Sequence, residues 1–315
     1  MKIEHILRNN YRIMNTAKAH EFRIKCPSCN NVKQKCYVNC IKNVYRCWHC
    51  GESGSLYKFI RRFHSEIDLK SLELEKTSMS IKSQFKTPMA LPEGFAPFFS
   101  TERESPMLDA CVEYLYERGL NYDMIKDYGM GYSRRFAHQV VVPIRNTMGK
   151  QVYFSTLTID KKLAFPHNPS ISDNYFSKGD ILFNINRISP STVVYLTEGI
   201  FDCISCVKSG KQAVALLGKE ITDNQIELLL SLGMTEIAIC LDGGEVTSTY
   251  KMAKKLKRYF DYVYICLLPE GKDPNDLDLT DYLLPYIEDL KLYLPKDKNK
   301  DLLNKFKSIF KKPLT

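Results

Sequence analysis

The sequence lacks an apolar run long enough to cross a bilayer. Its most apolar stretch, residues 262–268, falls far short of the roughly 20 residues that a membrane-spanning helix needs. The first residues also lack the apolar segment of a secretory signal, and the chain lacks internal repeats. Apolar residues make up 44% of the chain and charged residues 26%, a balance that excludes wholesale disorder. The sequence therefore predicts a folded, soluble protein of the cytoplasm.

Acidic residues are scarce in the first 62 residues, which hold 3 Asp or Glu against 13 Lys or Arg. The other 253 residues hold 33 acidic and 32 basic residues, so the net charge of +9 comes from the N-terminal segment. Six of the 11 cysteines lie in that same segment. An odd total in a cytoplasmic chain favours thiols and metal ligands over a disulfide framework.

The 315 residues predict about two domains with flanking segments. We expect a basic, β-rich module over 1–64, a linker rich in Ser and Lys over 65–92, a larger unit over 93–290 and a Lys-rich tail over 291–315. A helix is predicted over 107–118 and two strands over 138–157. From residue 191, apolar strands (192–197, 213–217, 236–241, 261–268) alternate with helices (201–208, 222–232, 248–259). This alternation predicts a parallel sheet that is covered on both faces.

Two cysteine pairs in the basic module have the spacing of a metal site. Cys26 and Cys29 form one Cys-x2-Cys knuckle, and Cys47 and Cys50 form a second, with 17 residues between the two knuckles. Four thiolates brought together in this way suit a closed, tetrahedral zinc site, which would stabilise a module too small to fold on apolar burial alone. The alternative is a set of reduced, unligated thiols. Cys36 and Cys40 share a strand face with Val38, so we expect them to be small buried side chains.

Cations and aromatic rings alternate along the same module. The candidate residues for binding nucleic acid are Lys33, Lys35, Tyr45, Arg46, Trp48 and His49. Single-stranded nucleic acid offers phosphates to cations and unstacked bases to rings, which favours this ligand. The alternative is a solvated basic hairpin whose rings fill a small core.

Acidic residues follow three of the predicted parallel strands. Glu198, Asp242 and Asp273 occupy these positions, and Asp202 lies one helical turn after Glu198. Because the carboxyl ends of parallel strands meet at one edge, the first three acids are expected to share a cleft. Clustered carboxylates repel one another, and divalent cations such as Mg²⁺ or Mn²⁺ relieve that repulsion. Taken singly, each acid has an alternative role as a helix cap.

These motifs together resemble the bacterial and bacteriophage DNA primases, over most of residues 15–285. The matching segments are Glu-Gly at 198–199 with Asp202, Ala-Leu-Leu-Gly at 215–218, Glu-Gly-Lys-Asp-Pro at 270–274 and Phe-Ser-Lys-Gly at 176–179. The resemblance implies a multidomain fold of the α+β and α/β classes. An N-terminal zinc ribbon is followed by a primase RNA polymerase domain, whose TOPRIM-like parallel sheet covers about 191–280.

The chain departs from the family at the third strand. The family has Asp-x-Asp there, whereas this chain has Asp242-Gly243-Gly244, with Glu245 displaced by one residue. A second departure is Ser155-Thr156, where the family has an arginine. The missing carboxylate bears on metal stoichiometry and catalysis rather than on the fold.

The resemblance implies a DNA primase, which makes short RNA primers on single-stranded DNA during replication by metal-dependent nucleotidyl transfer. Glu198, Asp242 and Asp273, supported by Asp202, are expected to hold Mg²⁺ or Mn²⁺, and Lys178 to contact phosphate. The implied partners are single-stranded DNA and ribonucleoside triphosphates. A separate helicase is also expected, because the chain has no P-loop segment. A bacteriophage origin would place the protein in the host cytoplasm.

Two other functions are compatible with these residues. One is a non-catalytic, zinc-dependent nucleic-acid-binding replication protein with a degenerate TOPRIM site, which the glycine at position 244 favours. The other is a TOPRIM nuclease or strand-passage enzyme.

Overall fold

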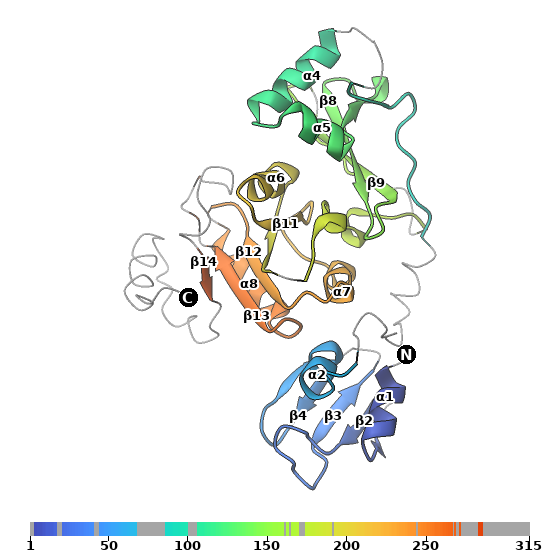
Figure 1. Ribbon diagram of the computed structural model, residues 1–315, viewed down its shortest axis with the longest axis vertical. Helices are drawn as coiled ribbons and strands as arrows, with labels where there is room; N and C mark the ends of the chain where they lie inside the picture. Colours follow the sequence, from blue (N-terminus) through green and yellow to red (C-terminus); the bar gives the residue numbers. More distant parts are fainter. Residues whose placement is uncertain are drawn as a thin grey trace.

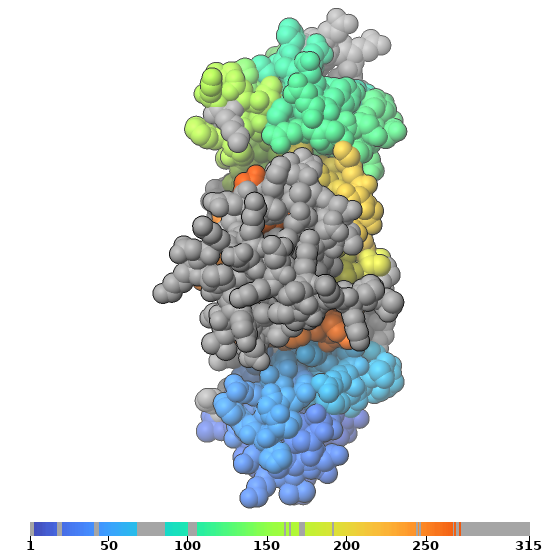
Figure 2. Space-filling view, turned by 90° about the vertical axis from the view of Figure 1, so that its left-hand side faces the viewer, coloured from blue at the N-terminus to red at the C-terminus, as the bar shows by residue number. Residues whose placement is uncertain are grey.

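The computed structural model describes residues 3–17, 21–40, 44–67, 86–99, 106–160, 162–163, 165–169, 174–190, 192–243, 245–266, 268, 271 and 283–285. The molecule is elongated, with residues 3–67 at one end, a parallel sheet in the middle and a second antiparallel sheet at the other end (Figures 1 and 2). The tail predicted over 291–315 lies outside the described residues. Within the described ranges, no helix is long and apolar enough to span a membrane.

The N-terminal module, residues 3–67, is an antiparallel sheet with the strand order β1-β2-β3-β4-β5. Its elements are α1 (Ile3–Asn10), β1 (Met14–Asn15), β2 (Glu21–Ile24), β3 (Cys36–Asn39), β4 (Val44–Cys47), β5 (Ser53–Ser55) and α2 (Leu56–Phe63). Alternate residues of β2 and β3 are buried, as expected of strands with one covered face: Phe22, Ile24, Cys36 and Val38. The predicted β-rich ribbon is confirmed.

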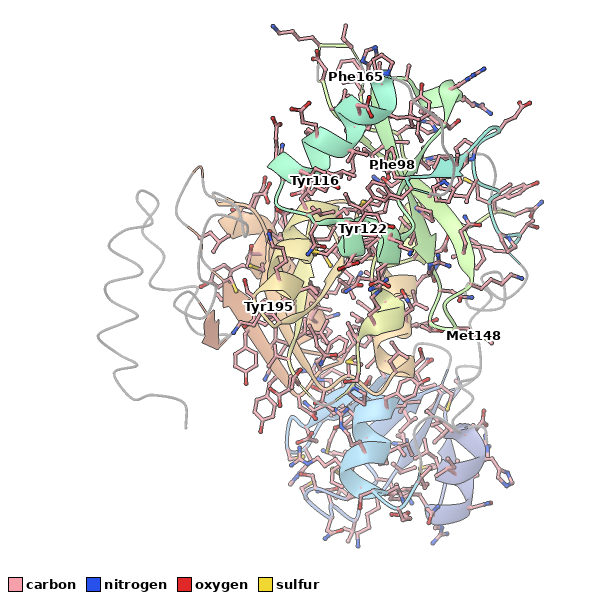
Figure 3. The ribbon with its side chains drawn as sticks, turned by 45° about the horizontal axis from the view of Figure 1, so that its top comes forward. Phe98, Tyr116, Tyr122, Met148, Phe165 and Tyr195 are labelled. Atoms are coloured by element: carbon pink, nitrogen blue, oxygen red, sulfur yellow. The ribbon has the colours of Figure 1, made fainter. Side chains whose placement is uncertain are left out.

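The second antiparallel sheet has the order β6-β7-β8-β9. This part of the chain contains β6 (Ala96–Pro97), α4 (Pro106–Glu117), α5 (Tyr122–Tyr128), β7 (Gly131–Tyr132), η2 (Arg134–Phe136), β8 (Gln139–Arg145) and β9 (Gln151–Thr158). The helix predicted over 107–118 and the strand pair predicted over 138–157 are both present. β8 and β9 form a hairpin, with exposed Met148 at its turn and exposed Phe165 beyond its open end (Figure 3).

Part of the segment predicted as a linker over 65–92 is described, namely residues 65–67 and 86–92. Its last residues lie against the second antiparallel sheet, where the N–H of buried Met89 donates to the carbonyl of Val152 at 2.9 Å. Thr87 forms a bridge with Tyr175. Backbone pairing therefore holds residues 87–89 against the neighbouring chain, while residues 68–85 lie outside the described residues.

The parallel sheet has the order β11-β10-β12-β13-β14, in which the first four strands are parallel and β14 is antiparallel. The elements of this part are η3 (Lys178–Asp180), η4 (Ile185–Arg187), β10 (Val194–Thr197), α6 (Ile200–Lys208), β11 (Gln212–Ala215), α7 (Asp223–Ser231), β12 (Glu236–Cys240), α8 (Val246–Leu256), β13 (Tyr262–Cys266) and β14 (Leu283–Pro285). The predicted parallel sheet with its alternating helices is confirmed, and β14 adds an antiparallel edge strand.

The two faces of the parallel sheet pack against different elements. Large residues such as Leu196 and Ile239 pack with α7, α8 and the N-terminal module. Alternate residues such as Ala215 and Ala238 face α6 and the second antiparallel sheet. Small side chains let those elements approach the strands closely. Both faces are therefore covered, and the loops at the carboxyl ends of the strands remain available for chemistry.

The N-terminal module docks at the opposite edge of the parallel sheet, where the strands begin. The N–H of Ser55 donates to the carbonyl of Arg258, beyond the end of α8, at 2.9 Å. Arg61 forms an ion pair of 2.5 Å with Asp261, which directly precedes β13. The apolar face of α2 joins the core shared with α8 and β13. The module therefore lies at the amino-terminal edge of the sheet.

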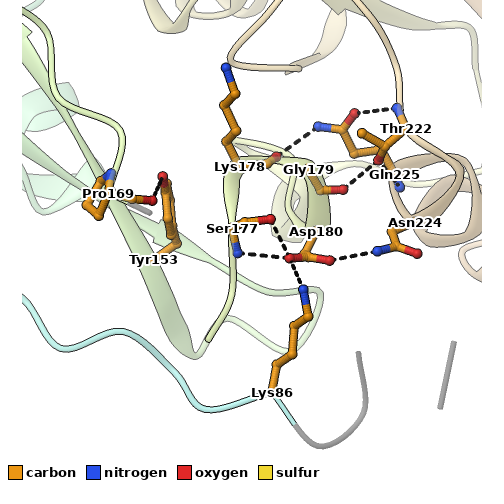
Figure 4. A network of polar contacts seen from close by, with 10 residues as sticks. All are labelled: Lys86, Tyr153, Pro169, Ser177, Lys178, Gly179, Asp180, Thr222, Asn224 and Gln225. Atoms are coloured by element: carbon orange, nitrogen blue, oxygen red, sulfur yellow. Dashed lines mark hydrogen bonds and ion pairs between the residues drawn. The ribbon is translucent and has the colours of Figure 1, made fainter. Parts of the chain in front are cut away.

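A buried ion pair anchors the loop that carries Lys178. The carboxylate of Asp180 accepts hydrogen bonds from Lys86, from the N–H (2.9 Å) and hydroxyl (2.6 Å) of Ser177, and from Asn224 (2.6 Å), as Figure 4 shows. Burial favours the neutral acid, yet these donors hold the pKa of Asp180 below its ordinary value. The network thereby links η3 to α7 and to the segment around Lys86.

Replacing Asp180 with asparagine leaves the Lys86 ammonium buried without its counter-ion. We expect D180N to lose about 3 kcal/mol of unfolding free energy at pH 7. Because the pKa of Asp180 is depressed by folding, its carboxylate stabilises the protein fully above the unfolded pKa of about 3.9, and this contribution disappears as the pH falls through the folded pKa. Urea unfolding at several pH values checks both points, since the gap between wild type and D180N should narrow in acid.

Asp127→Asn is the matched control, because Asp127 pairs with Arg187 on the surface and its side chain is 63% exposed. We expect this variant to lose less than about 1 kcal/mol. Equal losses in the two variants would contradict the role given to the buried pair.

Candidate metal sites and catalytic site

Four cysteines of the N-terminal module converge on one point. The Sγ atoms of Cys26, Cys29, Cys47 and Cys50 all lie within 4.8 Å of one another. The Cys26–Cys50 and Cys29–Cys47 sulfur pairs are each 3.8 Å apart. Metal–sulfur bonds of about 2.3 Å place the corners of a tetrahedron about 3.8 Å apart, so this thiol cluster fits a four-coordinate metal ion.

The knuckles of the thiol cluster are built from backbone turns. The N–H of Asn30 donates to the carbonyl of Cys26 at 2.7 Å, and the N–H of Gly51 donates to that of Cys47 at 3.0 Å. Gly51 has a φ of 78°, which glycine adopts without strain. Burial opposes ionisation of Cys47, but backbone N–H groups of Cys50 and His49 lower its pKa to about 7. These donors favour the thiolate that a metal requires.

The two remaining cysteines of the module are buried, as the sequence predicts. Cys40 is 2% exposed and Cys36 is fully buried. Cys36 lies directly across from Cys47 in the β3–β4 ladder, and burial raises the pKa of its thiol. A neutral thiol therefore lies beside the thiol cluster.

Most of the residues predicted to bind nucleic acid are exposed, but Tyr45 is not. Lys33, Lys35, Arg46, Trp48 and His49 are all accessible. Trp48 is 62% exposed, and the guanidinium of Arg46 lies 4.3 Å from the centre of its ring. Tyr45 is 2% exposed, donates a hydrogen bond of 2.8 Å to Glu52 and packs edge-on against Phe59. The prediction for Tyr45 is therefore wrong, because its ring fills the module core and cannot stack on a base.

The carboxyl edge of the parallel sheet gathers Glu198, Asp242 and Glu245. Glu198 follows β10 and Asp242 lies two residues after β12, and these neighbouring strands pair in register. Oε2 of Glu198 is buried and has no hydrogen-bond partner among the described residues. Burial raises the pKa of Glu198, and the charges of Asp242 and Glu245 raise it further, against the opposing effect of Lys219. An orphaned carboxylate oxygen beside a second carboxylate fits a hard divalent cation.

Asp202 and Asp273, the other two acids predicted for this site, are not among the carboxylates gathered above. Asp202 lies in the first turn of α6, and its Oδ2 accepts the N–H of Gly199 at 3.1 Å, so it caps the helix start. This is the alternative role that the sequence leaves open for single acids. Asp273 lies outside the described residues, as does Gly244.

Lys178 lies at the rim of a cavity of about 470 Å³ next to the carboxyl edge. Its side chain extends away from Asp180 and its donors (Figure 4), and makes no hydrogen bond or ion pair with any described residue. A Cβ atom placed on Gly218 would lie 3.8 Å from its Nζ. The ammonium of Lys178 is thus held near the end of β11 with its charge available to a ligand.

Two residues of this region are not found by the sequence reasoning. Gln225 is buried, and its Nε2 lies within hydrogen-bond distance of the carbonyls of Lys178 (3.1 Å), Ile181 (2.9 Å) and Leu216 (3.1 Å), so it fixes the loop of Lys178 against β11. Lys219, just beyond β11, forms an ion pair with Glu245. The signal for Lys219 was its position, since it follows a strand end as the predicted acids do.

The chain combines a thiol-cluster ribbon with a parallel sheet that carries acids at its carboxyl edge. This sheet is similar to a known class of domain. Residues 195–278 match the family described as Toprim-like. This segment holds β10 to β13 and therefore the acids of the carboxyl edge.

The particular relatives are DNA primases. The chain is 21% identical to the DNA primase of Mycoplasma genitalium, over 99% of this chain and 61% of that protein. It is 26% identical to the DNA primase of Aquifex aeolicus, over 81% of this chain and 60% of that protein. The chain thus spans about three fifths of the length of these relatives.

Solved primase structures share the fold. The zinc-binding and RNA polymerase domains of the Aquifex aeolicus primase match 99% of this chain and 95% of that one, with a TM-score of 0.52 and 18% identity. A DNA primase domain from Pseudomonas aeruginosa matches 73% and 88%, with a TM-score of 0.52 and 20% identity. The resemblance to DNA primases and the predicted fold class are both confirmed.

The thiol cluster predicts that the purified chain carries one tightly bound metal ion. We expect Cys50→Ser to lose most of this metal, because it removes one of four ligands, whereas Cys40→Ala should keep it, because Cys40 lies outside the cluster. Elemental analysis by mass spectrometry, after dialysis, measures the metal content per chain. Equal metal content in wild type and Cys50→Ser would contradict the assignment.

Proposed function

We propose that the chain is a DNA primase, which makes short RNA primers on a single-stranded DNA template by metal-dependent nucleotidyl transfer. The observation that carries this proposal is the orphaned oxygen of Glu198 beside Asp242, at the carboxyl edge of a Toprim-like sheet. The similarity to primases extends over both the ribbon and the α/β part, which supports the same reaction.

Glu198 and Asp242 are the described residues that would hold Mg²⁺ or Mn²⁺, and the resemblance adds Asp273. Such an ion, when bound, lowers the pKa of a coordinated hydroxyl and offsets negative charge on phosphate oxygens. In the reaction, the 3′-hydroxyl oxygen of the primer forms a bond to the α-phosphorus of a ribonucleoside triphosphate. The bond between that phosphorus and the bridging oxygen breaks, pyrophosphate leaves with the electron pair, and the hydroxyl proton passes to water.

The chain's own contribution at this site is positioning and charge. The cavity beside Lys178 is large enough for a nucleotide, and it offers the triphosphate an ammonium that no described residue pairs with. Gln225 and the Asp180 network hold that lysine's backbone in place, so its charge is preorganised before the substrate binds. Asp202 supports the site indirectly, because it caps the helix that follows Glu198.

The N-terminal module is proposed to bind the template through a zinc-stabilised surface. Zinc is the metal that four thiolates in a closed tetrahedron favour. Arg46, Trp48 and His49 present a cation and rings around the second knuckle, and Lys33 and Lys35 add charge. Because the module docks at the amino-terminal edge of the parallel sheet, template bound there lies across the sheet from the acids of the same chain.

Further partners follow from the proposed reaction. Ribonucleoside triphosphates are the substrates, and a separate helicase would expose the single strand. The proposed cellular location is the cytoplasm, or the cytoplasm of the host for a bacteriophage protein.

Asp242→Asn tests catalysis. We expect it to lower primer synthesis at least about 100-fold, because it removes a carboxylate that would hold the cation. The measurement is incorporation of labelled ribonucleotides on single-stranded DNA with Mg²⁺ or Mn²⁺, and Asp127→Asn serves as a surface control. If the wild-type protein makes no primer on any template while its thiol cluster is metal-loaded, the chain is the non-catalytic nucleic-acid-binding protein. If it cleaves DNA without added nucleotides, the nuclease is favoured.

Trp48→Ala tests template binding. We expect about 10-fold weaker binding of a fluorescent single-stranded oligonucleotide, because stacking on an exposed ring contributes about 1–3 kcal/mol per base. Val32→Ala is the control, since Val32 is 82% exposed in the same module but has no ring. Fluorescence anisotropy at fixed salt gives both affinities. Equal affinities for the two variants would exclude stacking on Trp48.

A further inference from the structure

Lys219 lies between the carboxylates of the sheet edge and the cavity beside Lys178. It directly follows Gly218, its side chain is 55% exposed, and it lines the cavity. Its ammonium forms an ion pair with Oε1 of Glu245. The ion pair with Glu245 is the largest influence on the pKa of Lys219, which is raised, and the charges of Glu198 and Asp242 raise it further. The ammonium of Lys219 therefore interacts with all three of these acids.

Glu245 is the acid nearest in sequence to the carboxylate that the chain lacks at position 244, but its side chain is already engaged. Lys219 binds its Oε1, and the hydroxyl of Ser248 donates to its Oε2 at 3.0 Å. Its backbone N–H donates to the carbonyl of Asp242 at 3.2 Å, and its carbonyl accepts from Thr249. Glu245 is therefore held at the start of α8 and would have to leave Lys219 to coordinate an ion.

The described side chains at this edge carry a net negative charge that Lys219 reduces. Of the described residues, Glu198, Asp242 and Glu245 together with Lys219 carry a formal charge of −2, equal in size to the charge of one divalent ion. Without the ammonium, the charge is −3, and one divalent ion leaves an excess that attracts another cation.

We propose that Lys219 takes the place of a second divalent ion, so that the site binds one ion, held among the described residues by Glu198 and Asp242. This inference rests on the metal site of the proposed function. The ammonium is a point charge on a flexible stem, and it faces the cavity where the triphosphate is proposed to bind. Lys219 thus offsets negative charge on the phosphates without the coordination geometry that a metal demands.

Manganese binding tests this role without a need for activity. Full-length, zinc-loaded protein is titrated with Mn²⁺, and electron paramagnetic resonance measures free and bound ion. We expect wild type to bind one Mn²⁺ that is lost in Asp242→Asn. Lys219→Met should bind a second ion or hold the first at least about 10-fold more tightly, because a competing charge is removed. Lys219→Arg, which keeps the charge, should restore the wild-type result.

Lys254→Met is the control, because Lys254 is an exposed cation on α8 and should leave Mn²⁺ binding unchanged. Circular dichroism confirms that each variant is folded. Two ions in wild type, or identical binding by wild type and Lys219→Met, would overturn the role of Lys219 and leave the primase proposal standing. A wild-type protein that binds no Mn²⁺ would overturn both.

Discussion

Carboxylates that the fold places side by side repel one another, and the carboxyl edge of the parallel sheet has to offset that repulsion with cations. The register of β10 and β12 brings Glu198 and Asp242 to the same edge, and burial makes the charge on Glu198 costlier still. Lys219 supplies part of the compensation from the end of β11. The remaining negative charge is what would attract a cation to this edge, and the proposed chemistry depends on it.

Contacts elsewhere in the structure hold the residues of the carboxyl edge in position. Small residues on one face of the sheet allow α6 to approach, and Asp202 caps the start of that helix directly after Glu198. On the substrate side, Gln225 and the buried Lys86–Asp180 pair hold the loop of Lys178 against β11. The N-terminal module carries the thiol cluster and docks at the far edge of the sheet, so the thiol cluster and the proposed cation site lie apart.

The features of the fold and of the candidate site that the sequence predicts are those that depend on local periodicity and on the spacing of motifs. Apolar strands alternating with helices reveal the parallel sheet, and parallel strands imply the common edge of Glu198 and Asp242. Pairings between distant side chains are not encoded in any local pattern: Lys86 and Asp180 are 94 residues apart, and nothing near Lys219 indicates Glu245 as its partner. The prediction that Tyr45 binds nucleic acid failed for a related reason. In a small module, an aromatic ring next to cations in the sequence can equally be part of the core.

Anomalous diffraction from a crystal soaked in Mn²⁺ tests the central claim most directly. The claim is that the carboxyl edge binds one divalent ion and that the ammonium of Lys219 takes the place of a second. The account predicts one manganese peak at the carboxyl edge, coordinated by Glu198 and Asp242, with Glu245 still paired to Lys219. A peak coordinated by Glu245, a pair of peaks, or the absence of manganese from this edge would contradict it.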